Sequence, residues 1–222
     1  MSFEQVISPR FDTLIDNAEY ETDRPFRLGL FGGTFDPVHI GHLHIAERAR
    51  EHYALDGVLF IPTGRPARKL AEGFSAAEDR HAMLVAATAD NEHFDVSRLE
   101  IERCGVTYTI DTLHLIKERY GDRASLFFIT GDDAAADIAT WKNAEEIATL
   151  ATVLSAKRAI PGDIERSLLH NVSHFHIESI DSCPIDVSSR ELRAWVRQGR
   201  SIRYLVPDAT YSYIREQRLY QG

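Results

Sequence analysis

Residues 28–44 read LGLFGGTFDPVHIGHLH. In this stretch an apolar run is followed by two adjacent glycines and then by two histidines that flank a third glycine. The run is typical of a buried strand that turns into a helix, and in a parallel α/β sheet ligands bind beyond such strand ends, where helix N-termini point. Gly32 and Gly33 let the backbone turn tightly and approach a ligand. His39 and His42 are three residues apart, so they share one face of the first helical turn, where free N–H groups attract phosphate. The stretch therefore predicts a phosphate site.

Gly41 supports this interpretation, because the missing side chain would let a flat base lie against the helix backbone. The spacing matches neither G-x-G-x-x-G nor a Walker A loop, so neither usual phosphate motif explains it. Two alternatives stay open at this point. The stretch is an ordinary glycine turn beside two surface histidines, or it is a metal site with His44 as an extra ligand, although residues 42 and 44 diverge around a helix.

From Arg27 onward, short β-rich runs alternate with helical patterns, which is typical of a parallel sheet covered by helices on both faces. The expected strands are RLGLF (27–31), GVLFIP (57–62), FDVSRLEI (94–101), SLFFIT (125–130), ATVLSAK (151–157) and SHFHIES (173–179). The expected helices lie within 39–55, 75–90, 109–121, 141–151, 188–199 and 207–220. Ser75 with Glu78 fits a capping box, and Gly121 fits a helix C-terminus.

Residues 1–24 are acidic and weakly apolar, and they precede the first clear strand. We interpret them as a mobile N-terminal leader in front of a single domain over residues 25–222. The alternative is a docked helix built on Phe11, Leu14 and Ile15. The leader has neither a basic region nor an apolar core, so we do not expect it to be a signal peptide.

Composition narrows the class of protein. The chain has 222 residues with a net charge of −9, which disfavours wholesale binding to nucleic acid. No stretch approaches the roughly 18 apolar residues that a membrane span needs, so no membrane partner is expected. Cys104 and Cys183 form no C-x-x-C or zinc spacing, which favours a reducing compartment, and we expect a cytoplasmic protein. A homo-oligomer stays open.

GGTFDPVHIGH (32–42) resembles, over its whole length, the signature of bacterial nicotinate-mononucleotide adenylyltransferases, which belong to the nucleotidyltransferase superfamily marked by H-x-G-H. Further motifs follow in family order, namely GRPARK (64–69), TYTIDTL (107–113), ITGDDA (129–134), TWKNAEEI (140–147) and VSSRELR (187–193). The resemblance covers about residues 27–219. It implies a Rossmann-like α/β fold of the nucleotidylyltransferase type, with an open parallel sheet and helices on both faces.

The resemblance also implies a reaction. The 5′-phosphate of nicotinate mononucleotide attacks the α-phosphorus of ATP, giving the deamido dinucleotide and pyrophosphate, with Mg²⁺ bridging phosphates rather than sitting in a protein cage. Such a transfer needs alignment and charge neutralisation more than covalent help from the protein. By resemblance, His39 and His42 contact the ATP phosphates. The turn residues implied to hold the nucleotide are Gly32, Gly33, Thr34, Phe35 and Gly41.

The later motifs supply the other implied contacts. Ser188 and Ser189 open a helix whose N-terminus is an anion site, and Ser188 with Glu191 also fits a capping box. Arg190 stands where the family usually has threonine, and Arg193 is the arginine that matches the family. By resemblance, Lys69 is a phosphate ligand, and Gly131 and Asp133 hold the nucleotide ribose. Arg80 lies on the next expected helix, from which we expect it to reach the same phosphates.

For the nicotinate end, Thr109 and Trp141 match family positions that bind the carboxylate through backbone and stack on the ring. A core role for Trp141 is the alternative. Lys142 stands where the family often has an aromatic residue, and its ammonium would favour a carboxylate over an amide.

Two other functions stay open. One is a related transferase that uses nicotinamide mononucleotide, phosphopantetheine or a CTP-linked alcohol, since H-x-G-H itself does not choose the substrate. The other is a nucleotide-binding regulator without catalysis, against which the intact His39, Gly41 and His42 speak.

Overall fold

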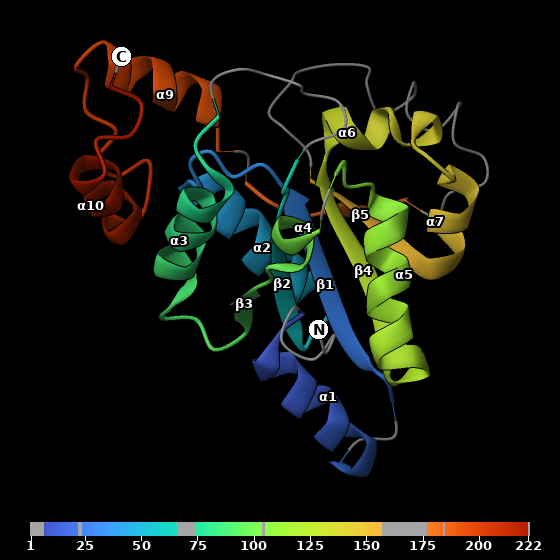
Figure 1. Ribbon diagram of the computed structural model, residues 1–222. Helices are drawn as coiled ribbons and strands as arrows, with labels where there is room; N and C mark the ends of the chain where they lie inside the picture. Colours follow the sequence, from blue (N-terminus) through green and yellow to red (C-terminus); the bar gives the residue numbers. More distant parts are fainter. Residues whose placement is uncertain are drawn as a thin grey trace.

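The computed structural model describes residues 7–21, 24–65, 74–103, 105–156, 177–183 and 185–221. It contains one six-stranded sheet in the order β3-β2-β1-β4-β5-β6, in which every neighbouring pair is parallel (Figure 1). The strands are β1 (Phe26–Gly33), β2 (Gly57–Pro62), β3 (Phe94–Val96), β4 (Ala124–Gly131), β5 (Ala151–Ala156) and β6 (Ile177–Ile180). This confirms the predicted α/β class with a parallel sheet.

Helices cover both faces of the sheet, as predicted. The helices are α1 (Pro9–Glu21), α2 (Ile40–His52), α3 (Ala77–Thr88), α4 (Leu99–Glu102), α5 (Thr109–Tyr120), α6 (Asp132–Ala136), α7 (Ala144–Leu150), α9 (Ser189–Arg197) and α10 (Asp208–Glu216), with short 3₁₀ turns η2 (Gly121–Arg123) and η3 (Ile138–Thr140). Helices α1, α5 and α7 bury their apolar residues in one core, whereas α2, α3, α9 and α10 bury theirs in a second core on the opposite face.

Alternation along β1 divides its side chains between the two cores. Leu28 and Leu30 point into the first core and Phe31 into the second, because successive side chains of a strand face opposite sides. A strand buried on both faces reads as a continuous apolar run, which is why LGLF has no polar residue.

The strand order decides where a ligand can bind. From β1 the chain moves outward to β2 and β3, then crosses back to β4 on the other side of β1. The crevice between the carboxyl ends of β1 and β4 is therefore the topological switch point, the usual ligand site of an open α/β sheet. The GGTF turn leaves β1 at this edge, which is the upper end of the sheet in Figure 1.

Two local predictions are wrong. Residues 94–101 were expected to form one strand, but β3 ends at Val96 and helix α4 covers Leu99–Glu102. The Ser75–Glu78 capping box is not formed, because α3 begins after Ala76 and Glu78 pairs with Arg98 at 2.6 Å. The last expected strand keeps only its end, as β6 spans Ile177–Ile180, and residues 173–176 lie outside the described residues.

The expectation of a mobile leader over residues 1–24 is also wrong for the described part of it, residues 7–21. Helix α1 packs against the sheet, where Phe11 and Ile15 are fully buried and the Phe11 ring contacts that of Phe26 in a tilted arrangement, 5.9 Å between centroids. A Cβ at Gly57 would lie 2.6 Å from the Phe11 ring, so β2 makes room for this docked side chain. The docked-helix alternative therefore holds, except that Leu14 is 43% exposed.

We expect Ile15→Val to lower the free energy of unfolding by about 1 kcal/mol, since it removes one methylene from a fully packed site. Leu14→Ala on the exposed face of the same helix should change it by less than about 0.5 kcal/mol. Chemical denaturation measures both values. If both substitutions had the same small effect, helix α1 would not be docked in solution.

Candidate active site

The GGTF turn is shaped by the packing of one aromatic ring. Phe35 adopts a left-handed backbone with φ of 51°, and its side chain is only 2% exposed. Its ring packs edge-on against Phe31 at 5.4 Å and against Phe60 at 5.8 Å. A Cβ at Gly33 would lie 2.9 Å from this ring, so Gly33 must be a glycine. Phe35 thus supports the turn from inside, and only its backbone is available to a nucleotide.

The histidine pair sits directly beyond this turn. The rings of His39 and His42 stack at 3.6 Å with 22° between their planes, which confirms that they share one face of helix α2. His42 also packs edge-on against Phe35 at 5.0 Å. The His39 N–H donates to His42 Nδ1 at 3.2 Å, so Nδ1 carries no proton and Nε2 carries it in the neutral ring. His42 is therefore held ready to donate a hydrogen bond from Nε2.

Gly41 lies where two helix N-termini meet. A Cβ here would lie 3.1 Å from both His39 Nδ1 and Val187 Cγ1, so the missing side chain makes room for that imidazole and for the start of α9. The contact with a nucleotide base that we predicted for Gly41 stays a prediction.

The N-terminus of α9 is built as the sequence predicts. Ser188 is its N-cap and accepts the Glu191 N–H at 3.3 Å, while its hydroxyl donates to the Glu191 carboxylate at 2.7 Å. Ser189 Oγ donates to the Pro37 carbonyl at 2.9 Å, which joins α9 to the GGTFDP turn. Two helix N-termini, those of α2 and α9, therefore converge on one small region, where their N–H groups favour an anion.

Arg193 supplies a cation beside these termini. Its Nη1 donates to the Asp36 carbonyl at 2.6 Å and lies 3.7 Å from Asp36 Oδ2. Its guanidinium lies 5.4 Å from the Phe74 ring, and the side chain is 15% exposed. The buried Nε has no hydrogen-bond partner among the described residues. Arg193 is thus anchored at one end of its guanidinium and retains donors for a phosphate.

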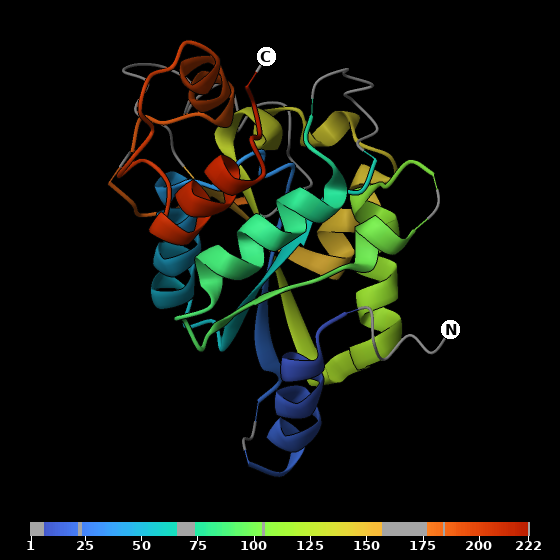
Figure 2. The same ribbon diagram turned by 60° about the vertical axis from the view of Figure 1, so that its left-hand side comes forward.

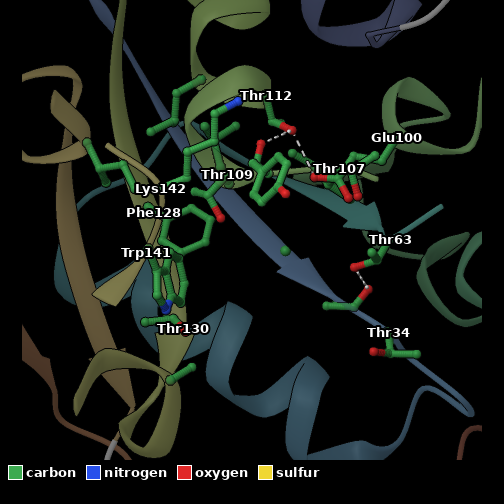
Figure 3. Close-up of a pocket in the computed structure, with 18 of the residues that line it drawn as sticks. Thr34, Thr63, Glu100, Thr107, Thr109, Thr112, Phe128, Thr130, Trp141 and Lys142 are labelled. Carbon is green, nitrogen blue, oxygen red and sulfur yellow. Dashed lines mark hydrogen bonds between the residues drawn. The ribbon is translucent and has the colours of Figure 1, made fainter. Parts of the chain in front are cut away.

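A cavity of about 370 Å³ opens on the other side of the same turn (Figure 3). Gly32, Gly33 and Thr34 form one wall at the end of β1, and Phe128 and Thr130 come from β4, so the cavity occupies the switch point. Trp141 forms the opposite wall and meets Phe128 edge-on at 5.8 Å and 85°. In the described part of the chain its buried Nε1 has no hydrogen-bond partner. Trp141 follows η3 rather than opening a helix, and its ring faces this cavity.

The N-terminus of helix α5 also lines the cavity, through Tyr108, Thr109 and Thr112. Lys142 lies at the rim, 3.1 Å from Asp111 Oδ1 and 4.6 Å from the centre of the Tyr108 ring. Burial raises the pKa of Asp111, but the Lys142 ammonium and the Arg103 guanidinium together outweigh burial and lower the pKa below its usual value. The Lys142 charge is therefore already paired, which weakens the specificity role that we predicted for it.

Glu100 is a carboxylate at the floor of the cavity that the sequence interpretation missed. It is 8% exposed and accepts a hydrogen bond from Thr112 Oγ1 at 2.8 Å, as Figure 3 shows. Burial raises the pKa of Glu100, and the Thr112 hydroxyl opposes this only in part. The sequence did contain one signal for a helix here. Arg98 and Glu102 have the spacing of a helical ion pair, and they form this pair at 2.9 Å.

The raised pKa of Glu100 gives a testable pH dependence. The folded protein binds the Glu100 proton more tightly than the unfolded chain does. The free energy of unfolding therefore falls as the pH rises from about 4.5 through the folded-state pKa. Glu100→Gln keeps an acceptor for Thr112 but cannot ionise. We therefore expect the melting temperature of this variant, relative to that of the unchanged protein, to increase between pH 4 and pH 8. A constant difference across this range would contradict a buried, titrating Glu100.

Arg80 is placed beneath the turn rather than at its surface. It is 3% exposed, and its guanidinium donates to the carbonyls of Thr34 at 2.9 Å, Gly64 at 3.3 Å and Ser75 at 3.3 Å. Burial lowers the pKa of Arg80, although Asp36 opposes this. The geometry makes Arg80 a clamp on three loops, and its contact with a phosphate stays a prediction.

The structure thus gathers the predicted residues into two adjoining groups. Thr34, Thr109, Trp141 and Lys142 line the cavity together with Gly32 and Gly33, whereas His39, Gly41, His42, Ser188, Ser189 and Arg193 surround the turn. Gly131 ends β4 next to them. Lys69 and the side chain of Asp133 lie outside the described residues.

Comparisons with known proteins identify the family of this chain. The sequence model of the cytidylyltransferase-like family matches residues 30–208. A probable nicotinate-nucleotide adenylyltransferase of Corynebacterium kroppenstedtii is 45% identical over 195 residues, which cover 87% of this chain and 90% of that protein. The chain belongs to the nicotinate-nucleotide adenylyltransferase family. A second probable member, from Salinispora arenicola, is 43% identical over 193 residues, covering 86% of this chain and 99% of its own.

Solved structures agree with this adenylyltransferase fold. The Plasmodium falciparum nicotinic acid mononucleotide adenylyltransferase complexed with NaAD superposes with a TM-score of 0.71 over 87% of this chain and 97% of its own, at 19% identity. That identity is low, so the likeness supports the Rossmann-like fold and not the details of the site.

The described residues contain neither a cluster of metal ligands nor a helix that could span a membrane. No group of three or more His, Cys, Asp or Glu side chains in this part of the adenylyltransferase could hold a metal ion. None of its helices there is long and apolar enough to cross a membrane.

Proposed function

We propose that this enzyme transfers AMP from ATP to the 5′-phosphate of nicotinate mononucleotide, giving deamido-NAD and pyrophosphate for NAD biosynthesis. One observation carries the proposal: the cavity of the switch point and the stacked His39–His42 pair lie on two sides of the same GGTF turn. A mononucleotide in the cavity would bring its phosphate to this turn. There it would meet the α-phosphate of ATP bound at the two helix N-termini.

The reaction then needs two aligned phosphates. An oxygen of the mononucleotide phosphate attacks the α-phosphorus, a new P–O bond forms, and the bond to the bridging oxygen of the β-phosphate breaks, so that pyrophosphate leaves. Phosphoryl-type transfer is accelerated chiefly by positioning and by neutralising the developing charge. The proton on His42 Nε2, the amides of the α9 N-terminus at Ser188 and the guanidinium of Arg193 are the donors that we assign to this charge. Lys69 is assigned to the same phosphates.

In this proposal Mg²⁺ enters the site together with ATP. A magnesium ion prefers oxygen ligands, but the turn offers mainly nitrogen groups, and both oxygens of Asp36 already accept hydrogen bonds from Tyr220 and Ser75. The described residues therefore do not form a cage for the ion. We propose that it arrives as MgATP, bound to the phosphate oxygens.

The nicotinate ring is assigned to the space between Trp141 and the N-terminus of α5. The indole would stack on the pyridine ring, and the amides near Thr109, with the positive end of the helix dipole, would hold the carboxylate. Cys104 and Cys183 form no C-x-x-C or zinc spacing, which favours a reducing compartment. We therefore place the enzyme in the cytoplasm.

A turnover assay tests the proposal. With MgATP and nicotinate mononucleotide, the protein should release pyrophosphate and form deamido-NAD in equal amounts. Phosphopantetheine with ATP, and CTP with an alcohol phosphate, serve as controls for other members of the superfamily. If pyrophosphate were released only with phosphopantetheine, that compound would replace nicotinate mononucleotide as the proposed substrate. No turnover with any acceptor would favour the nucleotide-binding regulator.

A further inference from the structure

Asp36 is a meeting point for distant parts of the chain. It lies in the turn between β1 and the histidine pair and is 1% exposed. Tyr220 Oη donates to Asp36 Oδ1 at 2.6 Å, across 184 positions of sequence. The Ser75 N–H donates to Oδ2 at 3.3 Å, and Arg193 donates to the backbone carbonyl at 2.6 Å. Three remote segments therefore converge on one buried carboxylate and its backbone.

Two of these bonds belong to a longer attachment. Residues 188–220, which we call the C-terminal strap, comprise α9, α10 and the turn after them, and α10 lies beside α3 in both views (Figures 1 and 2). The Ile40 N–H donates to the Leu205 carbonyl of the strap at 3.1 Å, and Ser189 Oγ of the strap donates to the Pro37 carbonyl. It thus holds the backbone on both sides of His39.

The end of the strap is shaped so that Tyr220 reaches this turn. Arg218 and Tyr220 both adopt left-handed backbones, with φ of 54° and 63°. Non-glycine residues hold such an unfavourable conformation only where the surroundings fix it. Leu219 and the Tyr220 ring pack against the second core. The chain therefore accepts an unfavourable backbone to place one hydroxyl on Asp36.

We infer that Tyr220 is a positioning residue for the transfer reaction, whose hydroxyl acts through Asp36 to fix the turn that orients His39 and His42. The inference rests on the proposed function for its kinetic part. It assigns a task to a residue near the C-terminus that does not contact the cavity. Small displacements of aligned groups are costly in such a reaction, since an error of about 1 Å can lower the rate 100-fold.

Tyr220→Phe is the central variant, because it removes only the hydroxyl. Tyr213→Phe is a matched control, since Tyr213 Oη of the same strap donates to Asp79 Oδ1 of helix α3 at 2.9 Å and not to a residue of the turn. For each variant we would measure kcat, KM for ATP, the melting temperature and the ¹H–¹⁵N imidazole shifts of His39 and His42. We expect Tyr220→Phe to lower kcat roughly tenfold and to move the imidazole shifts. Tyr213→Phe should change only the melting temperature.

A double-mutant cycle with Asp36→Ala, which leaves no acceptor for the Tyr220 hydroxyl, tests the route. If the hydroxyl acts through Asp36, then the double variant should be no slower than Asp36→Ala alone. Unchanged kcat and unchanged imidazole shifts in Tyr220→Phe would overturn the inference and leave Tyr220 as an anchor of the strap. The same conclusion would follow from additive losses in the cycle. Because the imidazole shifts need no turnover, they decide the inference even if nicotinate mononucleotide proves not to be the substrate.

Discussion

His42→Ala should fold normally and lose at least ~100-fold in kcat/KM, which is the effect of losing one donor to the charge that develops in a transition state. The structure gives the reason for the size of this effect. The ring is held by His39 and Phe35, and Nδ1 is occupied by the His39 N–H, so that Nε2 alone presents a proton. A preorganised donor of this kind needs no rearrangement during the reaction. Steady-state rates with both substrates varied measure the loss.

His44→Ala is the control for this prediction. His44 lies two residues further along α2, roughly 200° around the helix axis from His42, so its ring points away from the pair. We expect its kcat/KM to stay within about threefold of the unchanged enzyme. If His44→Ala were as costly as His42→Ala, the argument from the helix face would be wrong.

The second large effect concerns the choice between acid and amide. We expect the enzyme to turn over nicotinate mononucleotide roughly 10²–10⁴-fold better than nicotinamide mononucleotide, measured as the ratio of kcat/KM values. The N-terminus of α5 lines the cavity with N–H donors, and a carboxylate accepts from several of them. A carboxamide instead turns its own NH₂ group toward donors and leaves polar groups unpaired. Equal turnover would remove the nicotinate assignment but keep the adenylyl transfer.

Two variants separate the parts of this selectivity. Trp141→Ala should weaken both mononucleotides by about 1–2 kcal/mol of lost stacking and leave their ratio nearly unchanged. Lys142→Ala should change the ratio by less than about threefold, because Asp111 already pairs with the ammonium. A larger fall, greatest at low salt, would show that the Lys142 charge reads the carboxylate directly.

Local sequence was sufficient for the parts of the protein that depend on neighbours in the chain. LGLFGG predicts a buried strand and a tight turn, and His39 and His42 share a helix face because of their spacing. Ser188 and Glu191 form the expected cap, and Gly121 ends α5 with φ of 57°. Periods, caps and glycine turns are properties of a few consecutive residues, so they can be read without knowing the fold.

Other features depend on residues that meet only after folding. The 1–24 segment looked mobile because it is acidic and weakly apolar, yet Phe11 and Ile15 complete the core beneath the sheet. The strand expected through Glu100 ends early because the chain turns into α4 and buries that carboxylate in the cavity. Burial and its effect on a pKa come from atoms that are distant in sequence.

The same distinction holds at the site. Local sequence is enough to predict a glycine turn that leads into a helix with His39 and His42 on one face, because these glycines and imidazoles are neighbours in the chain. The pairing of Lys142 with Asp111 and the contact of Tyr220 with Asp36 become visible only in the folded protein. These contacts join segments separated by 31 and 184 positions. Their partners are fixed by how helices and strap pack on the sheet, and no local pattern encodes that packing.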